Sequence, residues 1–200
     1  MIKLVKYLVA DRKIRRLLRT APHRALADTG EDEFVRVTGT VEPYDARMLE
    51  APLSGRICAY YSLVVLKRRG FAPAGALATE QEAMPFILQQ GSQRAVIDPA
   101  HAQISSDYDY KENRMPIAFD SRQRSLLVRH GHGMVIEELL FREATLAIGE
   151  RIVVFGAATR EPDPEASVSD GGYREARPTR LRFTGTARFP LVISDDPRSL

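Results

Sequence analysis

One segment that is apolar on both of its faces constrains the fold of this 200-residue chain more than any other feature. It is the sequence RICAYYSLVVLK at positions 56–67, which follows a turn between Pro52 and Gly55. Its alternating side chains are Ile57, Ala59, Tyr61, Leu63 and Val65 on one face and Cys58, Tyr60, Ser62, Val64 and Leu66 on the other. A strand that is apolar on both faces lies inside a sheet, or in a barrel wall that something else covers. We therefore predict a β-sheet with this segment in its interior.

Several other segments also have strand patterns. FVRVTGTVE (34–42) alternates apolar and polar residues, with Gly39 as a candidate bulge or tight bend. PFILQQGSQRAVIDP (85–99) predicts a hairpin around Gly91, and LAIGERIVVFGAA (146–158) predicts a buried strand after a glycine turn. LRFTGTARFPLVISDD (181–196) predicts two short strands, the second interrupted by Pro190 and therefore at a sheet edge. The chain is predicted to be mainly β.

The remaining segments are predicted with less regular structure. RSLLVRHGHGMVIEELLFREA (124–144) indicates two strands joined at the His-Gly-His-Gly sequence. Residues 71–84 have the weak pattern of a connection, and residues 105–121 are polar and irregular. Residues 159–180 contain three prolines, a Gly-Gly pair and many charges, which predicts a long mobile loop.

The positive charge of the chain is concentrated at its N-terminus. Residues 1–24 carry eight basic side chains against Asp11 alone, whereas the rest of the chain is net acidic, within a total of +3. The apolar spacing predicts an amphipathic helix over 2–19, ended by Pro22. One interpretation is a helix that docks on the body of the protein; the other is a helix that contacts an anionic membrane surface. The basic residues for such a contact are Arg12, Lys13, Arg15, Arg16 and Arg19.

No apolar run approaches the roughly 20 residues that a membrane-spanning helix needs. The first ten residues, MIKLVKYLVA, are a poor signal peptide because they are short and contain two lysines. We expect a protein that is membrane-associated or cytoplasmic, without a signal peptide or transmembrane span in this chain.

The chain has few candidates for catalysis or metal binding. Cys58 is the single cysteine, so an intramolecular disulfide and multi-cysteine zinc modules are excluded, and its place in an apolar strand predicts a packing role. His130 and His132 have a chelating spacing, but too few further ligands accompany them. The acidic residues Asp107, Asp109 and Glu112 have the composition of a solvated loop. No metal, cofactor or enzymatic activity is expected.

Nucleic-acid binding is a weaker alternative. Small β-barrels bind single strands with aromatic side chains and a basic groove. Four aromatic residues could stack on bases: Tyr60, Tyr61, Tyr108 and Phe141. The net negative charge of the body disfavours phosphate binding. An OB-like protein that binds single-stranded nucleic acid or a small ligand therefore stays as the alternative function.

The sequence LEAPLSGRICAYY (49–61) resembles the signature of the GIDE-type domain, also called the "beside a membrane" domain, of the mitochondrial ubiquitin ligase activator family. Weaker matches follow in the expected order, and the similarity spans roughly residues 34–200. They are at 85–88, 95–99, 143–150 and 191–194.

The resemblance implies a non-catalytic, β-rich interaction or scaffold module next to a membrane, of the bacterial type without a RING. The expected architecture is a partly closed, OB-like β-barrel over 34–200 with an N-terminal amphipathic helix or arm over 1–24. One cysteine and four histidines are too few for the two four-ligand sites of a RING, so the ubiquitin ligase chemistry of the family is not expected here. The partner would be an unidentified protein. The structural signature positions are Pro52, Gly55, Arg56, Cys58 and Tyr61.

Overall fold

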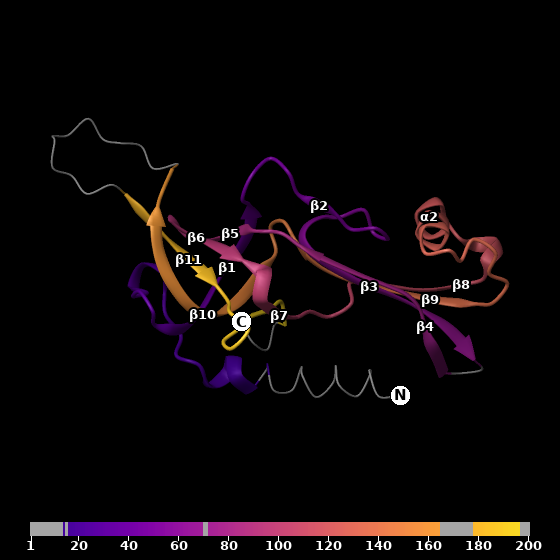
Figure 1. The fold of residues 1–200 in the computed structure, drawn as a ribbon, viewed down its shortest axis with the longest axis horizontal. Helices are drawn as coiled ribbons and strands as arrows, with labels where there is room; N and C mark the ends of the chain where they lie inside the picture. The colour runs from indigo at the N-terminus through magenta and orange to yellow at the C-terminus, as the bar shows by residue number, and fades with distance from the viewer. Residues whose placement is uncertain (1–13, 15, 70–71, 165–177, 197–200) are drawn as a thin grey trace. The chain divides into compact units, whose positions relative to one another are not determined.

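The structure is a computed structural model that describes residue 14 and residues 16–69, 72–164 and 178–196. Strands dominate it, which confirms the mainly β prediction (Figure 1). The chain divides into two compact units. Unit 1 is built from residues 1–45, 85–105 and 149–200, and unit 2 from residues 46–84 and 106–148.

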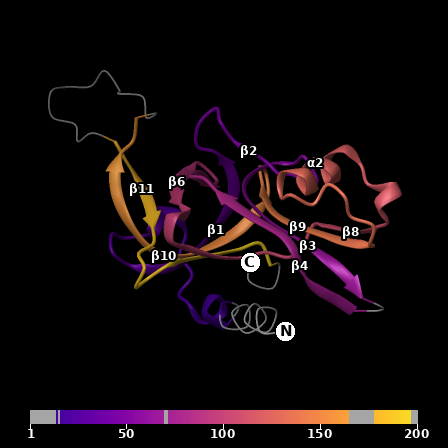
Figure 2. The same cartoon turned by 45° about the vertical axis from the view of Figure 1, so that its right-hand side comes forward.

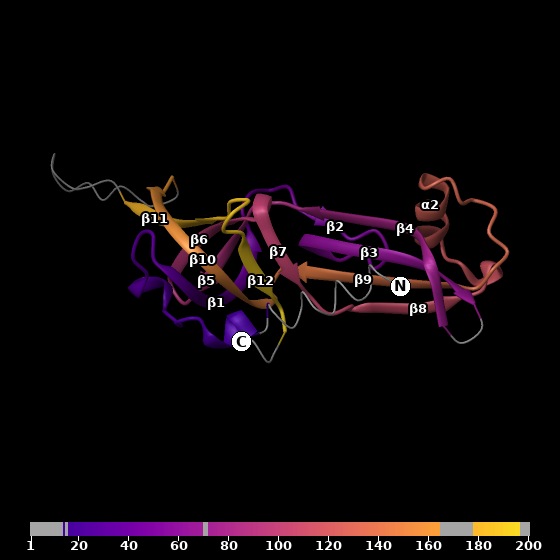
Figure 3. The same cartoon turned by 60° about the horizontal axis from the view of Figure 1, so that its bottom comes forward.

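Unit 1 contains a closed five-stranded barrel (Figure 3). Its strands are β1 (Phe34–Pro43), β5 (Phe86–Gln90), β6 (Gln93–Asp98), β10 (Arg151–Pro162) and β11 (Thr179–Thr184). They pair in the order β1-β5-β6-β11-β10, and β10 pairs back to β1. Only the β6–β11 pair is parallel within this ring. Numbered in chain order, the ring is 1-2-3-5-4-1, which is a Greek-key barrel of the OB type.

Two short strands extend the barrel sheet. β12 (Leu191–Ser194) pairs with β10 and with β7 (Ala102–Ser105), and β7 follows the short 3-10 helix η2 (Pro99–His101). Pro190 therefore precedes β12 and does not interrupt it. The expectation of an edge strand there is wrong, because β12 has a partner on each side. β10 extends to Pro162 and β11 begins at Thr179. Both ends of the loop predicted over 159–180 are therefore strand residues.

The interior of the barrel is filled by alternate residues of its strands. Val37 lies opposite Val154, and Val41 lies opposite Leu88; all four are completely buried. Gly39 continues this pattern in regular register with Ile152, so it is not a bulge. A Cβ at Gly39 would lie 2.6 Å from the carbonyl oxygen of Gln89. The glycine is therefore required by the close approach of β5, at the point where β1 passes from one partner strand to the next.

Part of the N-terminal helix packs on the outer surface of β10 and β12. Residue 14 and residues 16–20 are helical, and Ile14 and Leu18 are buried against Val153 and Val192. The described part of the helix thus has the docking role of the first interpretation. Arg16 and Arg19 on the same segment are exposed. The other basic residues of the expected contact lie outside the described residues: Arg12, Lys13 and Arg15.

A further N-terminal segment covers the outer face of β5 and β6. Ile87 and Val96 form a cross-strand pair that faces away from the barrel interior, and both are completely buried. The short 3-10 helix η1 (Leu26–Asp28) lies against β6. Its position is fixed by the backbone N–H of Leu26, which donates to Gln90 Oε1 at 2.7 Å.

Unit 2 is an antiparallel sheet with a helix on one side (Figures 1 and 2). Its elements are β2 (Leu49–Glu50), β3 (Ile57–Arg69), β4 (Ala72–Ala83), β8 (Tyr110–Arg114), β9 (Leu139–Ala147), the 3-10 helix η3 (Pro116–Ala118) and α2 (Ser121–Arg129). β3 pairs with β4 on one edge and β9 on the other, so the predicted interior position of the two-faced apolar segment is confirmed. α2 buries Leu126 and Leu127 in the same core cluster as Leu63 and Phe141.

Three predictions for unit 2 are wrong. Residues 71–84 contain strand β4, and residues 105–121 contain β8 and η3. The first of the two strands predicted over 124–144 is instead the end of α2. This helix begins with a capping box, in which Asp120 accepts from Gln123 N and the Gln123 side chain accepts from Asp120 N. His130 is the C-cap residue of α2, so the His-Gly-His-Gly sequence follows a helix and does not join two strands.

Candidate interaction site

The signature turn of unit 2 is held by a buried carboxylate from β9. Glu143 is completely buried and accepts hydrogen bonds from Leu53 N at 2.7 Å and Ser54 N at 2.9 Å. The turn also closes on itself, because Gly55 N donates to the carbonyl of Ala51 at 2.8 Å. A charged acceptor bound to two backbone donors gives strong hydrogen bonds. The turn is therefore a rigid feature of the sheet surface.

Gly55 brings this turn close to helix α2. Its φ of 71° is in the left-handed region, where glycine is favoured. A Cβ at this position would lie 2.6 Å from Nη2 of Arg122. The absence of a side chain thus leaves room for the guanidinium, which donates to Glu50 Oε1 at 2.6 Å.

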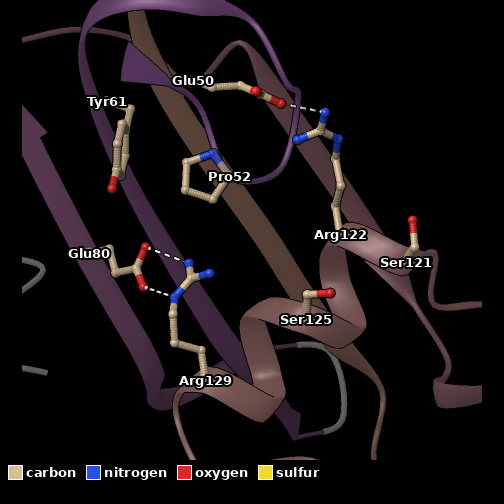
Figure 4. A pocket seen from close by; sticks show the side chains of 8 residues that line it. All are labelled: Glu50, Pro52, Tyr61, Glu80, Ser121, Arg122, Ser125 and Arg129. Carbon is tan, nitrogen blue, oxygen red and sulfur yellow. Dashed lines mark hydrogen bonds and ion pairs between the residues drawn. The ribbon is translucent and has the colours of Figure 1, made fainter. Parts of the chain in front are cut away.

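An open groove of about 550 Å³ lies between the turn and α2 (Figure 4). The turn side contributes Glu50 and Pro52, and the strands contribute Tyr61 and Glu80. The helix side contributes Ser121, Arg122, Ser125 and Arg129. All eight residues belong to unit 2.

The end of the groove near the C-terminus of α2 holds a hydrogen-bonded network of three residues. Arg129 donates to both carboxylate oxygens of Glu80, each at 2.9 Å, and His130 Nε2 lies 2.7 Å from Glu80 Oε1. Burial would raise the pKa of Glu80. The hydrogen bonds from Arg129 and His130 outweigh it and hold that pKa below its usual value. Glu80 is therefore a firmly ionised carboxylate with little remaining capacity to accept.

The other end of the groove is more open. Both side chains of the Arg122–Glu50 ion pair are about half exposed, at 45% and 54%. The hydroxyls of Ser121 and Ser125 have no hydrogen-bond partner in the described part of the chain. In Figure 4 these two serines lie on α2 with Arg122 and Arg129. This end of the groove therefore presents hydrogen-bonding groups that the protein itself does not use.

Three of the five signature residues lie at this groove. Pro52 and Tyr61 line it, and Gly55 lies against its Arg122. Arg56 lies 3.6 Å from Asp109 Oδ2, and the same carboxylate oxygen accepts from the backbone N–H and hydroxyl of Thr145. Burial and the Tyr61 hydrogen bond to Glu82 raise the pKa of the Tyr61 phenol to about 12.

Cys58 is completely buried in the core of unit 2. Burial, and secondly the charge of Glu143, raise the pKa of the thiol to about 11. A thiol in this state is protonated at neutral pH and is not a nucleophile. The position therefore agrees with the packing role predicted from the sequence.

The other sequence candidates are not brought together. Within the described ranges, no group of three or more His, Cys, Asp or Glu side chains could hold a metal ion. His130 contacts Glu80, and Asp109 contacts Arg56 on a different part of the sheet. Three of the four candidate stacking rings are buried, namely Tyr60, Tyr61 and Phe141.

Pro52 and Tyr61 were predicted from the sequence, but the charged residues and serines of the groove were not. Glu80 and Arg129 fall in segments that were predicted as a connection and a strand, so they had no predicted neighbours. Glu143 did carry a signal. It follows Leu139 and Phe141 on one face of an apolar strand, and a charged residue at such a position indicates a buried partner.

The fold and groove define a class of protein: an OB-type barrel whose chain leaves twice to form a second, groove-bearing sheet unit. Comparison of the chain with protein-family models, curated proteins and solved structures finds no match. Among the described helices, none has both the length and the hydrophobicity to cross a bilayer.

Proposed function

We propose that this chain is a non-catalytic interaction module of the GIDE type that works next to a membrane. The observation that carries the proposal is the groove of unit 2. Its charged groups are engaged with one another, Arg129 with Glu80 and Arg122 with Glu50, in front of a rigid turn. Such an arrangement offers charge and hydrogen bonds for recognition. Cys58, three positions after the turn residue Gly55, has a buried thiol with a pKa of about 11, which does not suit nucleophilic chemistry.

The membrane part of the proposal is supported by the N-terminal segment. Ile14 and Leu18 fix its described helical residues to the barrel, and Arg16 and Arg19 remain exposed beside them. Cations near an anionic lipid surface each contribute about 1 kcal/mol to binding. Replacing Arg16 and Arg19 with glutamine should therefore weaken binding to anionic vesicles by roughly thirtyfold.

Vesicle co-sedimentation of the full chain tests this part, with phosphatidylcholine vesicles that either contain or lack phosphatidylserine. Binding is expected only with phosphatidylserine and should fall with salt. The matched control replaces two exposed cations of the body, Lys111 and Arg151, with glutamine. Equal losses in the two double variants, or no binding to either vesicle, would contradict a membrane contact through the N-terminal segment.

The alternative of a single-strand nucleic-acid binder has less support. OB-type barrels bind oligonucleotides on the face of their second and third strands. The corresponding strands here are β5 and β6, whose outer residues Ile87 and Val96 are covered. Fluorescence anisotropy with labelled single-stranded oligonucleotides tests it: tight, salt-sensitive binding would favour the alternative over the interaction module.

A further inference from the structure

We propose that two phenylalanine side chains of unit 1, Phe34 and Phe189, insert into an anionic lipid bilayer beside the N-terminal segment. This inference rests on the membrane contact proposed above and names the apolar part of that contact, which the basic side chains do not supply. It follows from a cluster of aromatic rings next to the docked helix and from the arginines around it.

The N-terminal helix covers only part of the outer surface of the barrel. Its buried residues Ile14 and Leu18 pack against Val153 and Val192, and Phe155 is partly buried beside them. Phe155 and Val192 are register partners on the neighbouring strands β10 and β12. Phe155 therefore lies at the margin of the surface that the helix covers.

Two exposed rings continue this apolar surface from Phe155. The ring centroid of Phe34 lies 6.2 Å from that of Phe155, and the ring centroid of Phe189 lies 5.9 Å from that of Phe34. Phe34 is 46% exposed and Phe189 is 54% exposed. Single exposed apolar residues are common on proteins, whereas neighbouring ones mark interaction surfaces. We call these three rings, of Phe34, Phe155 and Phe189, the aromatic cluster.

Phe189 is presented by a tight turn between β11 and β12. Its backbone N–H donates to Thr186 Oγ1 at 3.0 Å, and Thr186 N donates to the carbonyl of Phe189 at 2.9 Å. The turn also lies close to its neighbours, because a Cβ at Gly185 would be 2.5 Å from the carbonyl oxygen of His101. A backbone that already holds the ring in an exposed position reduces the ordering cost of binding.

The end of the docked helix lies next to the same cluster. The carbonyl of Pro22, just after the helix, accepts from Arg36 N at 2.8 Å, and Arg36 is the register partner of Phe155. Arg19, three positions before Pro22, is exposed. The basic end of the helix and the aromatic cluster therefore belong to one region of unit 1.

Three exposed arginines in this region keep their charge. Arg188 is in the turn, and its guanidinium lies 5.2 Å from the ring centroid of Phe189. Arg16 and Arg19 are on the helix. Within the described ranges, none of the three pairs with a carboxylate. Their charges are therefore available to anionic headgroups.

The acidic turn before β1 does not cancel this charge. Glu33 forms an ion pair with Arg24 at 3.4 Å. Glu31 accepts from the backbone N–H of Arg160, a fourth exposed arginine, at 2.9 Å. Glu31 and Asp32 are thus two carboxylates against four arginines, so the region keeps a positive balance.

Apolar rings beside such arginines suit the interface of an anionic bilayer. Segments that bind a membrane surface bury phenylalanine and leucine at the acyl boundary and place arginine at the headgroups. A nucleic-acid base, by contrast, stacks on a free aromatic face. Arg188 lies over the ring of Phe189, and Phe34 meets that ring edge-on, with an interplanar angle of 63°. The geometry therefore favours lipid over a single-stranded nucleic acid.

Tryptophan fluorescence of Phe189→Trp tests the insertion, because the sequence contains no tryptophan. With phosphatidylcholine vesicles that contain phosphatidylserine, the emission of the full chain should shift to shorter wavelength, and brominated lipids should quench it. The control is Ile57→Trp, because Ile57 is 51% exposed but belongs to unit 2. Vesicle binding without a shift at position 189, or an equal shift at position 57, would overturn the proposal.

Vesicle co-sedimentation of matched variants measures the contribution of each group. Phe189→Ser should weaken binding at least about tenfold, and Ile57→Ser should not change it. Arg188→Gln should weaken binding about fivefold, whereas Arg151→Gln, at another exposed arginine of unit 1, should have no effect. Equal losses within either pair would overturn the proposal. Circular dichroism melting of each variant separates lost binding from lost folding.

The basic and aromatic parts of the contact can fail separately. At a lipid concentration that fully binds the Arg16→Gln, Arg19→Gln double variant, Phe189→Trp in that background should show the same emission shift. A loss of binding in the double variant but not in Phe189→Ser would overturn the insertion and leave the N-terminal contact. The reverse result would overturn the N-terminal contact and support the insertion. Tight oligonucleotide binding that Phe189→Ser abolishes would assign the aromatic cluster to nucleic acid and overturn the proposal.

Discussion

The carboxylate of Glu143 accepts a hydrogen bond from the backbone N–H of Leu53 at 2.7 Å, although 90 positions separate the two residues. Its second oxygen binds Ser54 N at 2.9 Å. Leu53 and Glu143 lie in two of the segments that resemble the GIDE-type domain, at 49–61 and 143–150. These two segments therefore form a single structural feature, a turn and its buried acceptor.

Glu143→Ala should destabilise the protein by about 3 kcal/mol, because it leaves two backbone N–H groups without their charged acceptor. Urea denaturation followed by circular dichroism measures the change. Glu137→Ala is the matched control, since Glu137 forms a half-exposed ion pair with Lys67 and should cost less than about 1 kcal/mol. Equal losses in the two variants would contradict the role of Glu143.

Gly55→Ala should destabilise unit 2 and displace Arg122. An alanine with positive φ costs about 1 kcal/mol, and here its Cβ would also lie within 2.6 Å of the guanidinium. Gly75→Ala separates the two effects, because Gly75 has a φ of 63° and nothing within 4 Å of a Cβ. Thermal melting should show a larger loss for Gly55→Ala. A loss no larger than that of Gly75→Ala would show that Arg122 does not restrict the turn.

Cys58 should react slowly with iodoacetamide in the folded protein. A pKa raised from 9.0 to about 11 lowers the thiolate fraction at pH 8 by about 100-fold, and burial reduces access further. Mass spectrometry of samples alkylated with and without urea compares the two states. Equally fast labelling in both would mean that the thiol is exposed and ionised, contrary to the packing role.

The same raised pKa predicts a loss of stability in alkali. Below pH 9 the thiol is protonated in the folded and unfolded states, so its contribution is fully present. Between pH 9 and about 11 only the unfolded state releases the proton, and stability falls as pH rises through this window. Cys58→Ala should lack this part of the alkaline decline in urea titrations at pH 8, 9 and 10.

The lowered pKa of Glu80 predicts that stability is lost as pH falls, whereas the raised pKa of Cys58 predicts a loss as pH rises. The lowered folded-state pKa of Glu80 gives a contribution that is present above the unfolded value of 4.5 and lost as pH falls through the folded pKa. Glu80→Gln should cost about 1 kcal/mol at pH 7 and flatten the acid limb of a stability profile. The control is Glu33→Gln, because Glu33 also pairs with an arginine, the half-exposed Arg24 of unit 1. An unchanged acid limb in Glu80→Gln would contradict a strong Arg129–Glu80–His130 network.

Helix α2 shows how a local signal can be overlooked. Its residues Leu126, Leu127 and Val128 resemble a short apolar strand, which led to the strand prediction. The capping box of Asp120 and Gln123 was present in the sequence and marks a helix start. The decisive observation is that Leu126 and Leu127 are buried while Val128 is 66% exposed. That is a helical pattern of burial, which only packing against the sheet makes visible.

The sequence by itself determined the mainly β class, the interior position of β3, the hairpin at Gly91 and the packing role of Cys58. These follow from alternation, turn residues and local polarity, which are properties of neighbouring residues. The tertiary structure decided that residues 46–84 and 106–148 form a sheet of their own, and that Glu143, Gly55 and Arg122 meet around one turn. Those contacts join residues far apart in the chain, so they depend on strand pairing and helix docking that no local pattern specifies.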